Sequence, residues 1–595
     1  MKSILVSLSQ QENLSNMTTV QLDPAIQGRA EAWLKAPYDE DTIQSVKQLF
    51  DSGDYTGLTD SFYKDLEFGT GGLRGIMGVG TNRMNKYTIG RATQGLSNYL
   101  LKTYPGERVK AAISYDSRNN SKAFARLVAD VFSANGIQVY LFAELRPTPH
   151  LSFAVRHLQC HAGVMLTASH NPKEYNGYKA YWNDGGQLVP PHDKNVINEV
   201  YAIEDPSEIN FGPVEENITL LGKELDDAYL DAISALIIRP DAVSRQKELK
   251  IVFSPIHGTG VTLVPPALQR WGFANVNVVE AQATPDGNFP TVVYPNPEEA
   301  EAMSLALREG ERIEADVIFA TDPDADRVGA AVKNTQGVYQ LLNGNQIGSL
   351  LVNYVLSAKK EQGDLRPDDY VVKTIVTTNL IADIARQYGV TYYDTLTGFK
   401  YIGELITLKD GQGRFLVGGE ESYGYLVGEL VRDKDAVVSA VFIAEMTAYY
   451  KDQGKTLFDA LLDLYVRHGY YKEKLISLTK TGKAGAEEIK AMMERLRSNP
   501  LQTIGGIDVA EIKDYERSES YNLKTGERKA IDLPKSDVLQ FITVDGDVVS
   551  ARPSGTEPKI KFYCSVRQPL SNAADFERVS RELDERVDRI MKDIA

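Results

Sequence analysis

The sequence Thr-Ala-Ser-His-Asn-Pro at residues 167–172 decides how the whole chain is interpreted. It follows an apolar run at 162–166 that is typical of a buried strand. Because α/β folds place their chemistry on loops at the carboxyl ends of strands, we expect Ser169 on such a loop. Pro172 should keep the loop from continuing into a helix, since the residue before a proline avoids helical angles. Taken alone, the motif is equally compatible with a serine-rich turn.

Strands and helices are expected to alternate around this loop. Apolar runs predict strands at 110–115, 137–142 and 162–166, with a helix at 121–135 and another that begins at His150. Such alternation is typical of α/β layering.

The same layout occurs three times, and each time a polar loop follows a strand. From about residue 470 the pattern changes to a smaller α+β domain with a long charged helix at the end. We therefore predict a helical lead-in at 1–55, α/β domains at 56–212, 213–340 and 341–468, and a C-terminal domain at 469–595.

Composition limits the classes of partner. The 595-residue chain has 65 Lys and Arg against 81 Asp and Glu, a net charge of -16, which argues against nucleic acid or an anionic membrane as a partner. Two cysteines, Cys160 and Cys564, encode no disulfide framework. The N-terminus turns polar too soon for a secretory signal, although Met17 is an alternative start, and apolar runs stay short of the ~20 residues that span a bilayer. We expect a cytoplasmic protein that is a monomer or a weak homodimer.

Three aspartates follow the apolar strand predicted at 315–320. Asp322, Asp324 and Asp326 alternate with other residues, and in an extended loop such positions point to one side. Three hard oxygen donors suit magnesium. An EF-hand is excluded because Arg327 stands where its glycine is required. A solvated acidic turn remains the alternative.

Two further segments carry cations and hydroxyls. Residues 552–561 combine hydroxyls, a glycine and cations, which are the ingredients of a phosphate-binding loop, although a basic turn between strands is the alternative. The glycine-rich run at 68–75 presents Arg74, which can reach a phosphate with little hindrance.

A carboxylate and a hydroxyl follow the strand predicted at 414–417. Glu420 and Ser422 are placed to bind neighbouring sugar hydroxyls, because one carboxylate accepts from two hydroxyls at once. A helix N-terminus with acidic capping is the alternative.

Together, these motifs resemble the α-D-phosphohexomutase family, which includes phosphoglucomutases and phosphomannomutases. The resemblance covers about residues 50–595. It rests on four motifs in order: residues 167–172, Asp-x-Asp-x-Asp-Arg at 322–327, Gly-Glu-Glu-Ser-Tyr-Gly at 419–424, and Arg-x-Ser-Gly-Thr at 552–556 with Lys561.

The resemblance implies three topologically similar mixed-sheet α/β domains and a C-terminal α+β domain like the TATA-binding protein, around a central cleft. It implies that Ser169 carries the phosphoryl group and binds Mg²⁺ together with Asp322, Asp324 and Asp326. The transfer site would be lined by Arg74, His170, Lys179, Arg327 and Lys400, the sugar held by Thr397, Gly398, Glu420 and Ser422, and the substrate phosphate bound by Arg552, Ser554, Gly555, Thr556 and Lys561.

The implied reaction converts glucose 1-phosphate to glucose 6-phosphate, with glucose 1,6-bisphosphate as intermediate and activator. We expect Lys179 to act as the base, with its pKa lowered by nearby cations. Lys561 stands where the family has arginine, which keeps the charge but loses the two-pronged donor. The alternatives are a phosphopentomutase or a phosphomannomutase, and, from other classes, a phosphatase-like hydrolase or a non-catalytic sugar-phosphate binding protein.

Overall fold

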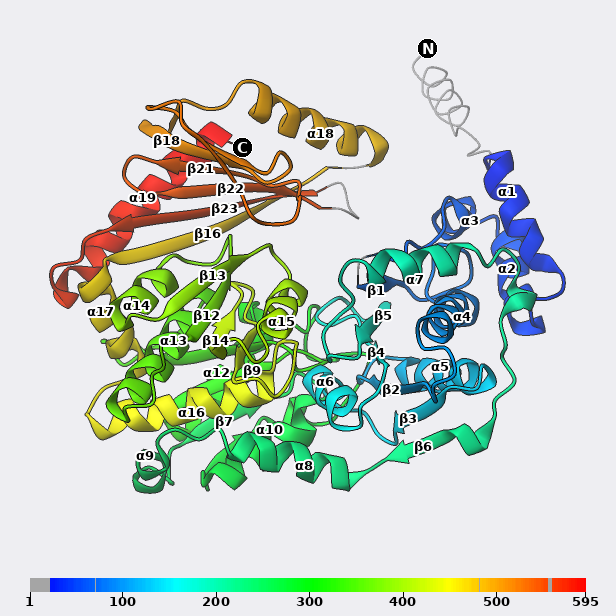
Figure 1. Ribbon diagram of the computed structural model, residues 1–595, viewed down its shortest axis with the longest axis horizontal. Helices are drawn as coiled ribbons and strands as arrows, with labels where there is room; N and C mark the ends of the chain where they lie inside the picture. The colour runs from blue at the N-terminus through cyan, green and yellow to red at the C-terminus, as the bar shows by residue number, and fades with distance from the viewer. Residues whose placement is uncertain (1–21, 70, 481, 555–558, 595) are drawn as a thin grey trace, which may run out of the picture.

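The computed structural model describes residues 22–69, 71–480, 482–554 and 559–594. Three short helices begin it, α1 (Pro24–Glu31), α2 (Glu40–Asp51) and α3 (Tyr55–Phe62), and they pack at one end of the molecule (Figure 1). Four sheets follow along the chain. We call each of the first three sheets with its helices an α/β unit, and the fourth the C-terminal unit.

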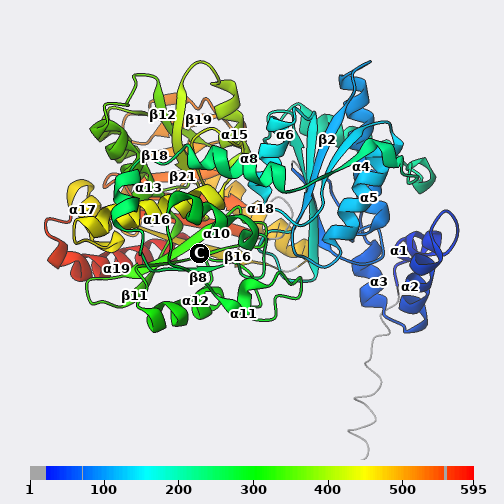
Figure 2. The same ribbon diagram turned by 90° about the horizontal axis from the view of Figure 1, so that it is seen from below.

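The first unit presents Ser169 at the end of a central strand. Its sheet has the order β1-β5-β4-β2-β3-β6, in which β2, β3, β4 and β6 are parallel and β5 is antiparallel to β4 and β1. Helix α6 covers one face, and α4 and α5 cover the other (Figure 2). The elements are β1 (Gly72–Ile76), α4 (Lys86–Thr103), β2 (Lys110–Tyr115), α5 (Ser121–Ala134), β3 (Gln138–Phe142), α6 (Thr148–His157), β4 (Ala162–Leu166), β5 (Tyr175–Trp182), α7 (His192–Tyr201) and β6 (Ile218–Leu221).

The first sheet extends beyond residue 212. Strand β6 pairs in parallel with β3, so residues that the sequence pattern assigned to the second domain complete the first sheet. This strand was not predicted, because four residues at a sheet edge carry little periodic signal.

The second unit has the sheet order β11-β10-β9-β7-β8. Strand β9 is parallel to β7, and β10 turns back antiparallel to it. The elements are α8 (Lys223–Ser234), α9 (Pro240–Arg245), β7 (Ile251–Ser254), α10 (Gly260–Trp271), β8 (Val276–Val278), α11 (Glu280–Ala283), α12 (Ala300–Ile313), β9 (Val317–Thr321), β10 (Val328–Lys333) and β11 (Tyr339–Leu342).

The third unit repeats this plan in the order β13-β12-β14-β15, with β15 antiparallel to β14. Helix α16 is buried throughout residues 436–448, and it packs on α10 of the second unit as well as on β15, which joins the two cores. The elements are α13 (Gly344–Glu361), β12 (Asp369–Thr374), α14 (Leu380–Tyr388), β13 (Thr391–Thr395), α15 (Phe399–Leu408), β14 (Arg414–Gly419), β15 (Tyr425–Val427), α16 (Ala436–Asp452) and α17 (Leu457–His468).

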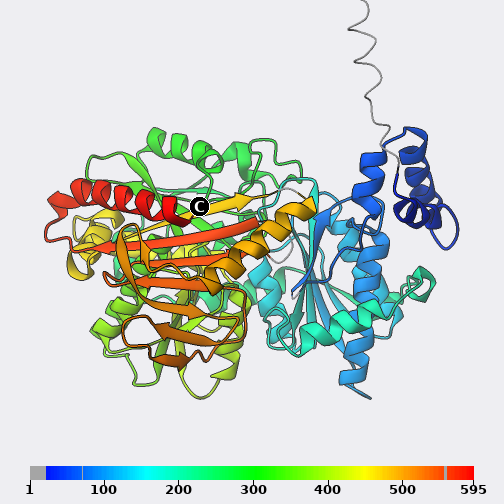
Figure 3. The same ribbon diagram turned by 90° about the horizontal axis from the view of Figure 1, so that it is seen from above.

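The C-terminal unit is an antiparallel sheet with helices on its outer face (Figure 3). Its other face is turned toward the α/β units (Figure 1). The main elements are β16 (Tyr470–Thr479), α18 (Gly482–Ser498), β18 (Ile507–Asp514), β21 (Leu539–Thr543), β22 (Val548–Pro553), β23 (Lys559–Gln568) and α19 (Phe576–Ile594).

The predicted fold class is confirmed: three mixed α/β sheets precede an α+β unit. In each α/β unit, a motif loop connects a parallel strand to an antiparallel neighbour. These loops lie between β4 and β5, between β9 and β10, and between β14 and β15. None of the helices in the described part of the chain combines the length and the apolar character that a bilayer span needs.

Candidate active site

One cleft of about 910 Å³ is lined by residues of all four units. Its volume is in the range of small-molecule sites. Asp322 and Asp324 are fully buried beside it, and Ser554 is not among its lining residues. Gly555 and Thr556 lie outside the described residues. The predicted site residues that line it are Arg74, Ser169, His170, Lys179, Asp326, Arg327, Thr397, Gly398, Lys400, Glu420, Ser422, Arg552 and Lys561.

Ser169 is held in a strained conformation by its own loop. It adopts a positive φ of 52°, its backbone N–H donates to Thr167 Oγ1 at 2.8 Å, and its carbonyl accepts from the Arg118 guanidinium at 2.6 Å. Thr167 in turn donates to Asp116 at 2.6 Å. Asp116 and Arg118 were not predicted, although they follow β2 just as the Ser169 motif follows β4. Strain maintained by surrounding contacts is typical of functional sites.

The hydroxyl of Ser169 points at the aspartate loop of the second unit. Its Oγ donates to Asp322 Oδ2 at 2.7 Å and lies 3.1 Å from His170 Nδ1. Ser169 is 3% exposed. The serine oxygen and the acidic loop, which are far apart in the sequence, therefore form one site.

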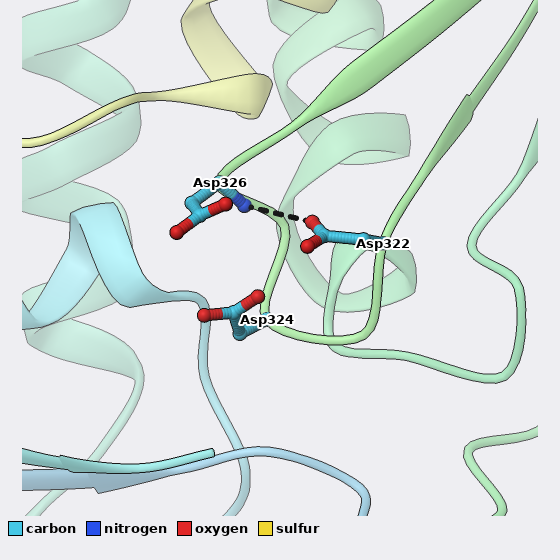
Figure 4. A group of neighbouring side chains, drawn as sticks. All are labelled: Asp322, Asp324 and Asp326. Atoms are coloured by element: carbon cyan, nitrogen blue, oxygen red, sulfur yellow. Dashed lines mark hydrogen bonds between the residues drawn. The ribbon is translucent and has the colours of Figure 1, made fainter. Parts of the chain in front are cut away.

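The three aspartates converge, as predicted, but for a different reason. One carboxylate oxygen of each lies within 4.8 Å of the others, and Figure 4 shows the side chains surrounding one space. The loop is a tight turn rather than an extended segment: Ala325 has a φ of 48°, and the backbone N–H groups of Asp326 and Arg327 donate to Asp322 Oδ1. The turn, and not strand alternation, brings the carboxylates together.

The donor set fits a divalent cation. Asp324 Oδ1 and Asp326 Oδ1 are buried and have no hydrogen-bond partner among the described residues. Burial raises the pKa of Asp322 well above its usual value, and the neighbouring Asp324 and Asp326 add to the effect. Three buried carboxylates, of which Asp324 and Asp326 each keep an unused oxygen, match the hard-oxygen coordination of magnesium.

Lys179 contacts two of these aspartates. Its Nζ donates to Asp324 Oδ2 at 2.7 Å and to Asp326 Oδ2 at 2.9 Å. Burial lowers the pKa of Lys179, but the two carboxylates outweigh it and the net direction is upward. The predicted lowering of the pKa was wrong, because carboxylates rather than cations are the nearest charges to the ammonium group.

A second buried lysine, Lys434, approaches the same aspartate from the third unit. Its Nζ lies 3.3 Å from Asp326 Oδ2 and 3.0 Å from Asp433 Oδ1, and it lines the cleft. Burial lowers the pKa of Lys434, but these two carboxylates raise it above the ordinary value. Lys434 was not predicted, because it lies outside the loops that follow the predicted strands.

Two more of the predicted cations, Arg74 and Arg327, lie around the Ser169 loop. Arg327 donates to Glu298 at 2.7 Å, and Arg74 donates to the Asn171 side chain at 3.4 Å. Burial together with Arg327 and Arg74 holds the pKa of His170 well below its usual value, so the imidazole is neutral at pH 7.

The sugar-binding loop predicted at 419–424 connects two strands. It lies between β14 and β15, so the alternative of a helix N-terminus is excluded. Glu420 Oε1 accepts from the backbone N–H of Gly398 at 2.9 Å, which ties it to the loop that carries Thr397. Thr397 Oγ1 is buried, has no hydrogen-bond partner in the part of the chain that the structure describes, and lines the cleft, so it is available to a ligand.

The predicted phosphate-binding end lies on the C-terminal sheet. Arg552 on β22 and Lys561 on β23 are direct register partners, and Lys559 also lines the cleft. Burial lowers the pKa of Lys561, and Lys559 and Arg552 lower it further. We call this cluster the grip end, and the region of Ser169, Lys179 and the aspartate loop the transfer end.

Comparisons with known proteins agree with this arrangement. Four family models of phosphoglucomutase/phosphomannomutase match this chain in order. They are alpha/beta/alpha domain I at residues 65–207, domain II at 227–337, domain III at 343–467 and the C-terminal domain at 488–579. A phosphoglucomutase of Staphylococcus haemolyticus (strain JCSC1435) is 38% identical over 555 residues, which covers 93% of this chain and 98% of that protein. A phosphoglucomutase of Staphylococcus aureus (strain MRSA252) is also 38% identical, over 557 residues, with 93% and 97% covered.

Solved structures share the fold. The crystal structure of a putative phosphomannomutase from Thermus thermophilus has a TM-score of 0.65 at 23% identity, and covers 88% of this chain and 99% of that chain. The open form of parafusin, a phosphoglucomutase from Paramecium, has a TM-score of 0.64 at 17% identity, with 88% and 95% covered. Since all four family domains are matched in order and the relatives align over nearly their whole length, this protein is an enzyme of the phosphoglucomutase/phosphomannomutase family.

Proposed function

We propose that the protein interconverts glucose 1-phosphate and glucose 6-phosphate through a phosphorylated Ser169. The observation that carries the proposal is that a single cleft contains a buried serine against three converging aspartates and, on another unit, a pair of cations. Phosphoryl transfer needs positioning and charge neutralisation more than it needs covalent chemistry from the protein, and the cleft supplies both.

In the first step, phosphoserine donates its phosphoryl group to a sugar hydroxyl. The bond between Ser169 Oγ and phosphorus breaks, a bond from the sugar oxygen to phosphorus forms, and the proton that the sugar hydroxyl gives up is balanced by the proton that Ser169 Oγ takes up as it becomes a hydroxyl again. Asp322, Asp324 and Asp326 would hold Mg²⁺ together with the phosphorylated Ser169, and the ion would neutralise charge on the transferring group. Because Lys179 is held as a cation between two carboxylates, we assign it to charge neutralisation rather than to proton removal.

The bisphosphate formed in this way must turn around before the second step. The grip end binds whichever phosphate is not being transferred, through Arg552 and Lys561 with Ser554, Gly555 and Thr556 of the same motif. Glu420 and Ser422, with Thr397 and Gly398, would contact the sugar hydroxyls. Arg74, His170, Arg327 and Lys400 would complete the transfer end. The other phosphate then returns to Ser169, which restores the starting enzyme.

Glucose phosphate is the preferred substrate in this proposal because the relatives at 38% identity are phosphoglucomutases. Phosphomannomutase and phosphopentomutase activities are the alternatives within the same mechanism. A non-catalytic binding protein would need neither the strained serine nor the aspartate cluster. We further propose Mg²⁺ as cofactor, glucose 1,6-bisphosphate as activator, a cytoplasmic location, and a monomer or weak homodimer.

A substrate comparison tests the proposal. Glucose 1-phosphate, mannose 1-phosphate and ribose 1-phosphate would be supplied in turn with Mg²⁺ and a trace of the matching bisphosphate. We expect the highest kcat/KM for glucose 1-phosphate. Faster conversion of the ribose ester would move the protein to the phosphopentomutases, and no conversion of any ester would overturn the mutase function.

A further inference from the structure

Residues 432–435 join the third unit to the other two α/β units. We call them the junction segment; they lie between β15 and α16. The backbone N–H of Arg432 donates to Ser152 Oγ on α6 at 3.0 Å, and Asp435 accepts from the hydroxyl of Tyr229 on α8 at 2.7 Å. The ends of the segment are therefore attached to the first and second units.

Asp433 divides its two oxygens between two units. Oδ2 accepts from the Tyr181 hydroxyl at 2.8 Å and from Gln187 Nε2 at 2.8 Å, both in the first unit. Oδ1 accepts from the backbone N–H of Lys434 at 2.8 Å and from its Nζ at 3.0 Å. The first unit thus fixes the orientation of the carboxylate that holds Lys434.

A closed ring of contacts results at the transfer end. Lys179 and Tyr181 are two residues apart on β5 and point to the same side of the strand. Lys179 reaches Asp326, Lys434 reaches the same oxygen of Asp326, and Asp433 links Lys434 back to Tyr181. Asp433, Lys434 and Asp326 are 1%, 7% and 2% exposed, so these interactions are shielded from water.

The ring makes the position of Lys434 depend on Asp433. A buried ammonium group needs a fixed counter-charge, and among the described residues the ion-pair partner that remains without Asp433 is Asp326, which Lys179 already contacts. Loss of the Asp433 charge would let Lys434 move toward Asp326 or out into the cleft. Displacements of about 1 Å at a transfer site can cost on the order of a hundredfold in rate.

We propose that Asp433 is a positioning residue for phosphoryl transfer, which holds Lys434 at the transfer end and is itself oriented by Tyr181 and Gln187. The inference rests on the proposed mutase function. Asp433 acts through Lys434, and its effect belongs in kcat rather than in the binding of the sugar phosphate at the grip end.

Two variants test this role. Asp433→Asn keeps the shape but removes the charge, and we expect kcat to fall about tenfold or more while KM for glucose 1-phosphate changes less than about threefold. Tyr181→Phe removes one hydrogen bond to Asp433, and a smaller fall in kcat, about threefold, is expected. If Asp433→Asn does not fold, Tyr181→Phe still tests the role of Asp433.

Tyr229→Phe is the matched control. It also removes a buried tyrosine hydroxyl from a carboxylate of the junction segment. The Asp435 side chain, however, caps α16 through the backbone N–H of Val438, and within the described residues no ion pair joins it to the Lys434 ammonium group. This variant should lower the melting temperature and leave kcat unchanged. Equal losses of kcat in Tyr229→Phe and Tyr181→Phe would show that the junction segment acts only on stability, and would overturn the inference.

A double-mutant cycle separates positioning from general destabilisation. In a Lys434→Met background, Asp433→Asn should cause no further loss of kcat, because the group that it positions is gone. If the double variant instead lost kcat by the product of the two single effects, the inference would be overturned. If the wild type is active and Asp433→Asn leaves kcat unchanged, the inference alone is overturned. If the wild type has no mutase activity, the proposed function is overturned and the inference with it.

Discussion

At the transfer end of the cleft, buried side chains from three units bond to one another, whereas at the grip end Arg552 and Lys561 stand on neighbouring strands of one sheet. The C-terminal unit is attached to the third unit by contacts such as Gln540 to the Ile375 carbonyl at 2.7 Å and Tyr471 to Asp383 at 2.6 Å. The transfer end is therefore organised before substrate arrives. The position of the grip end depends on how the C-terminal unit docks on the third unit. Changes at the transfer end should appear in kcat and changes at the grip end in KM.

The largest expected effect is at Ser169. Replacing it with alanine removes the oxygen that carries the phosphoryl group, so we expect kcat to fall by at least about a thousandfold, with little change in the binding of glucose 1-phosphate. Steady-state kinetics and calorimetric titration measure the two quantities. A variant that retains most of its turnover would break the comparison, because the transfer end would then have no special role.

The next effect is at the aspartate loop. Asp324→Asn leaves the side-chain volume but weakens the oxygen set for Mg²⁺, and a loss of about a hundredfold or more in magnesium-dependent kcat is expected. Asp545→Asn, at an exposed carboxylate, is the control and should match the wild type. Circular dichroism checks that both fold. The metal assignment fails if Asp324→Asn shows the same magnesium dependence as the wild type.

At the grip end, we predict that Lys561→Met raises KM for glucose 1-phosphate about tenfold to a hundredfold, because a charge-assisted hydrogen bond contributes about 1.5–3 kcal/mol. The effect on kcat should be much smaller. Lys561→Arg supplies a two-pronged donor beside Arg552 and should lower KM by a few-fold. If both variants changed kcat alone, the division of labour between the two ends would be wrong.

The smallest effect concerns stability and pH, away from both ends. Burial raises the pKa of Glu445 on α16 to about 7, against 4.5 for an ordinary glutamate. The unfolded chain therefore releases this proton at lower pH than the native one, so Glu445 removes stability progressively as pH rises from about 4.5 to about 7, by a few kcal/mol. Glu445→Gln should gain melting temperature relative to the wild type between pH 5 and pH 8, measured by calorimetry. A constant difference across this range would contradict the predicted pKa.

Residues that stand in one continuous motif were predictable, and contacts between units were not. The Ser169 and aspartate loops were found because strand runs precede them, and the cleft brings them together. Lys434 and Asp433 carry no such signal, because their function follows from Tyr181 and Asp326, which lie far away in the sequence. The predicted direction of the Lys179 pKa shift was wrong for the same reason, since the shift depends on how close the carboxylates of another unit lie.

Phosphorylation of Ser169 tests the central claim most directly. Intact-protein mass spectrometry after incubation with glucose 1,6-bisphosphate and Mg²⁺ should show the gain of one phosphoryl group, with peptide mapping at Ser169. Addition of glucose 1-phosphate should remove the group and yield bisphosphate at the rate of turnover. Full mutase turnover with no phosphoryl group on Ser169 at any stage would contradict the account.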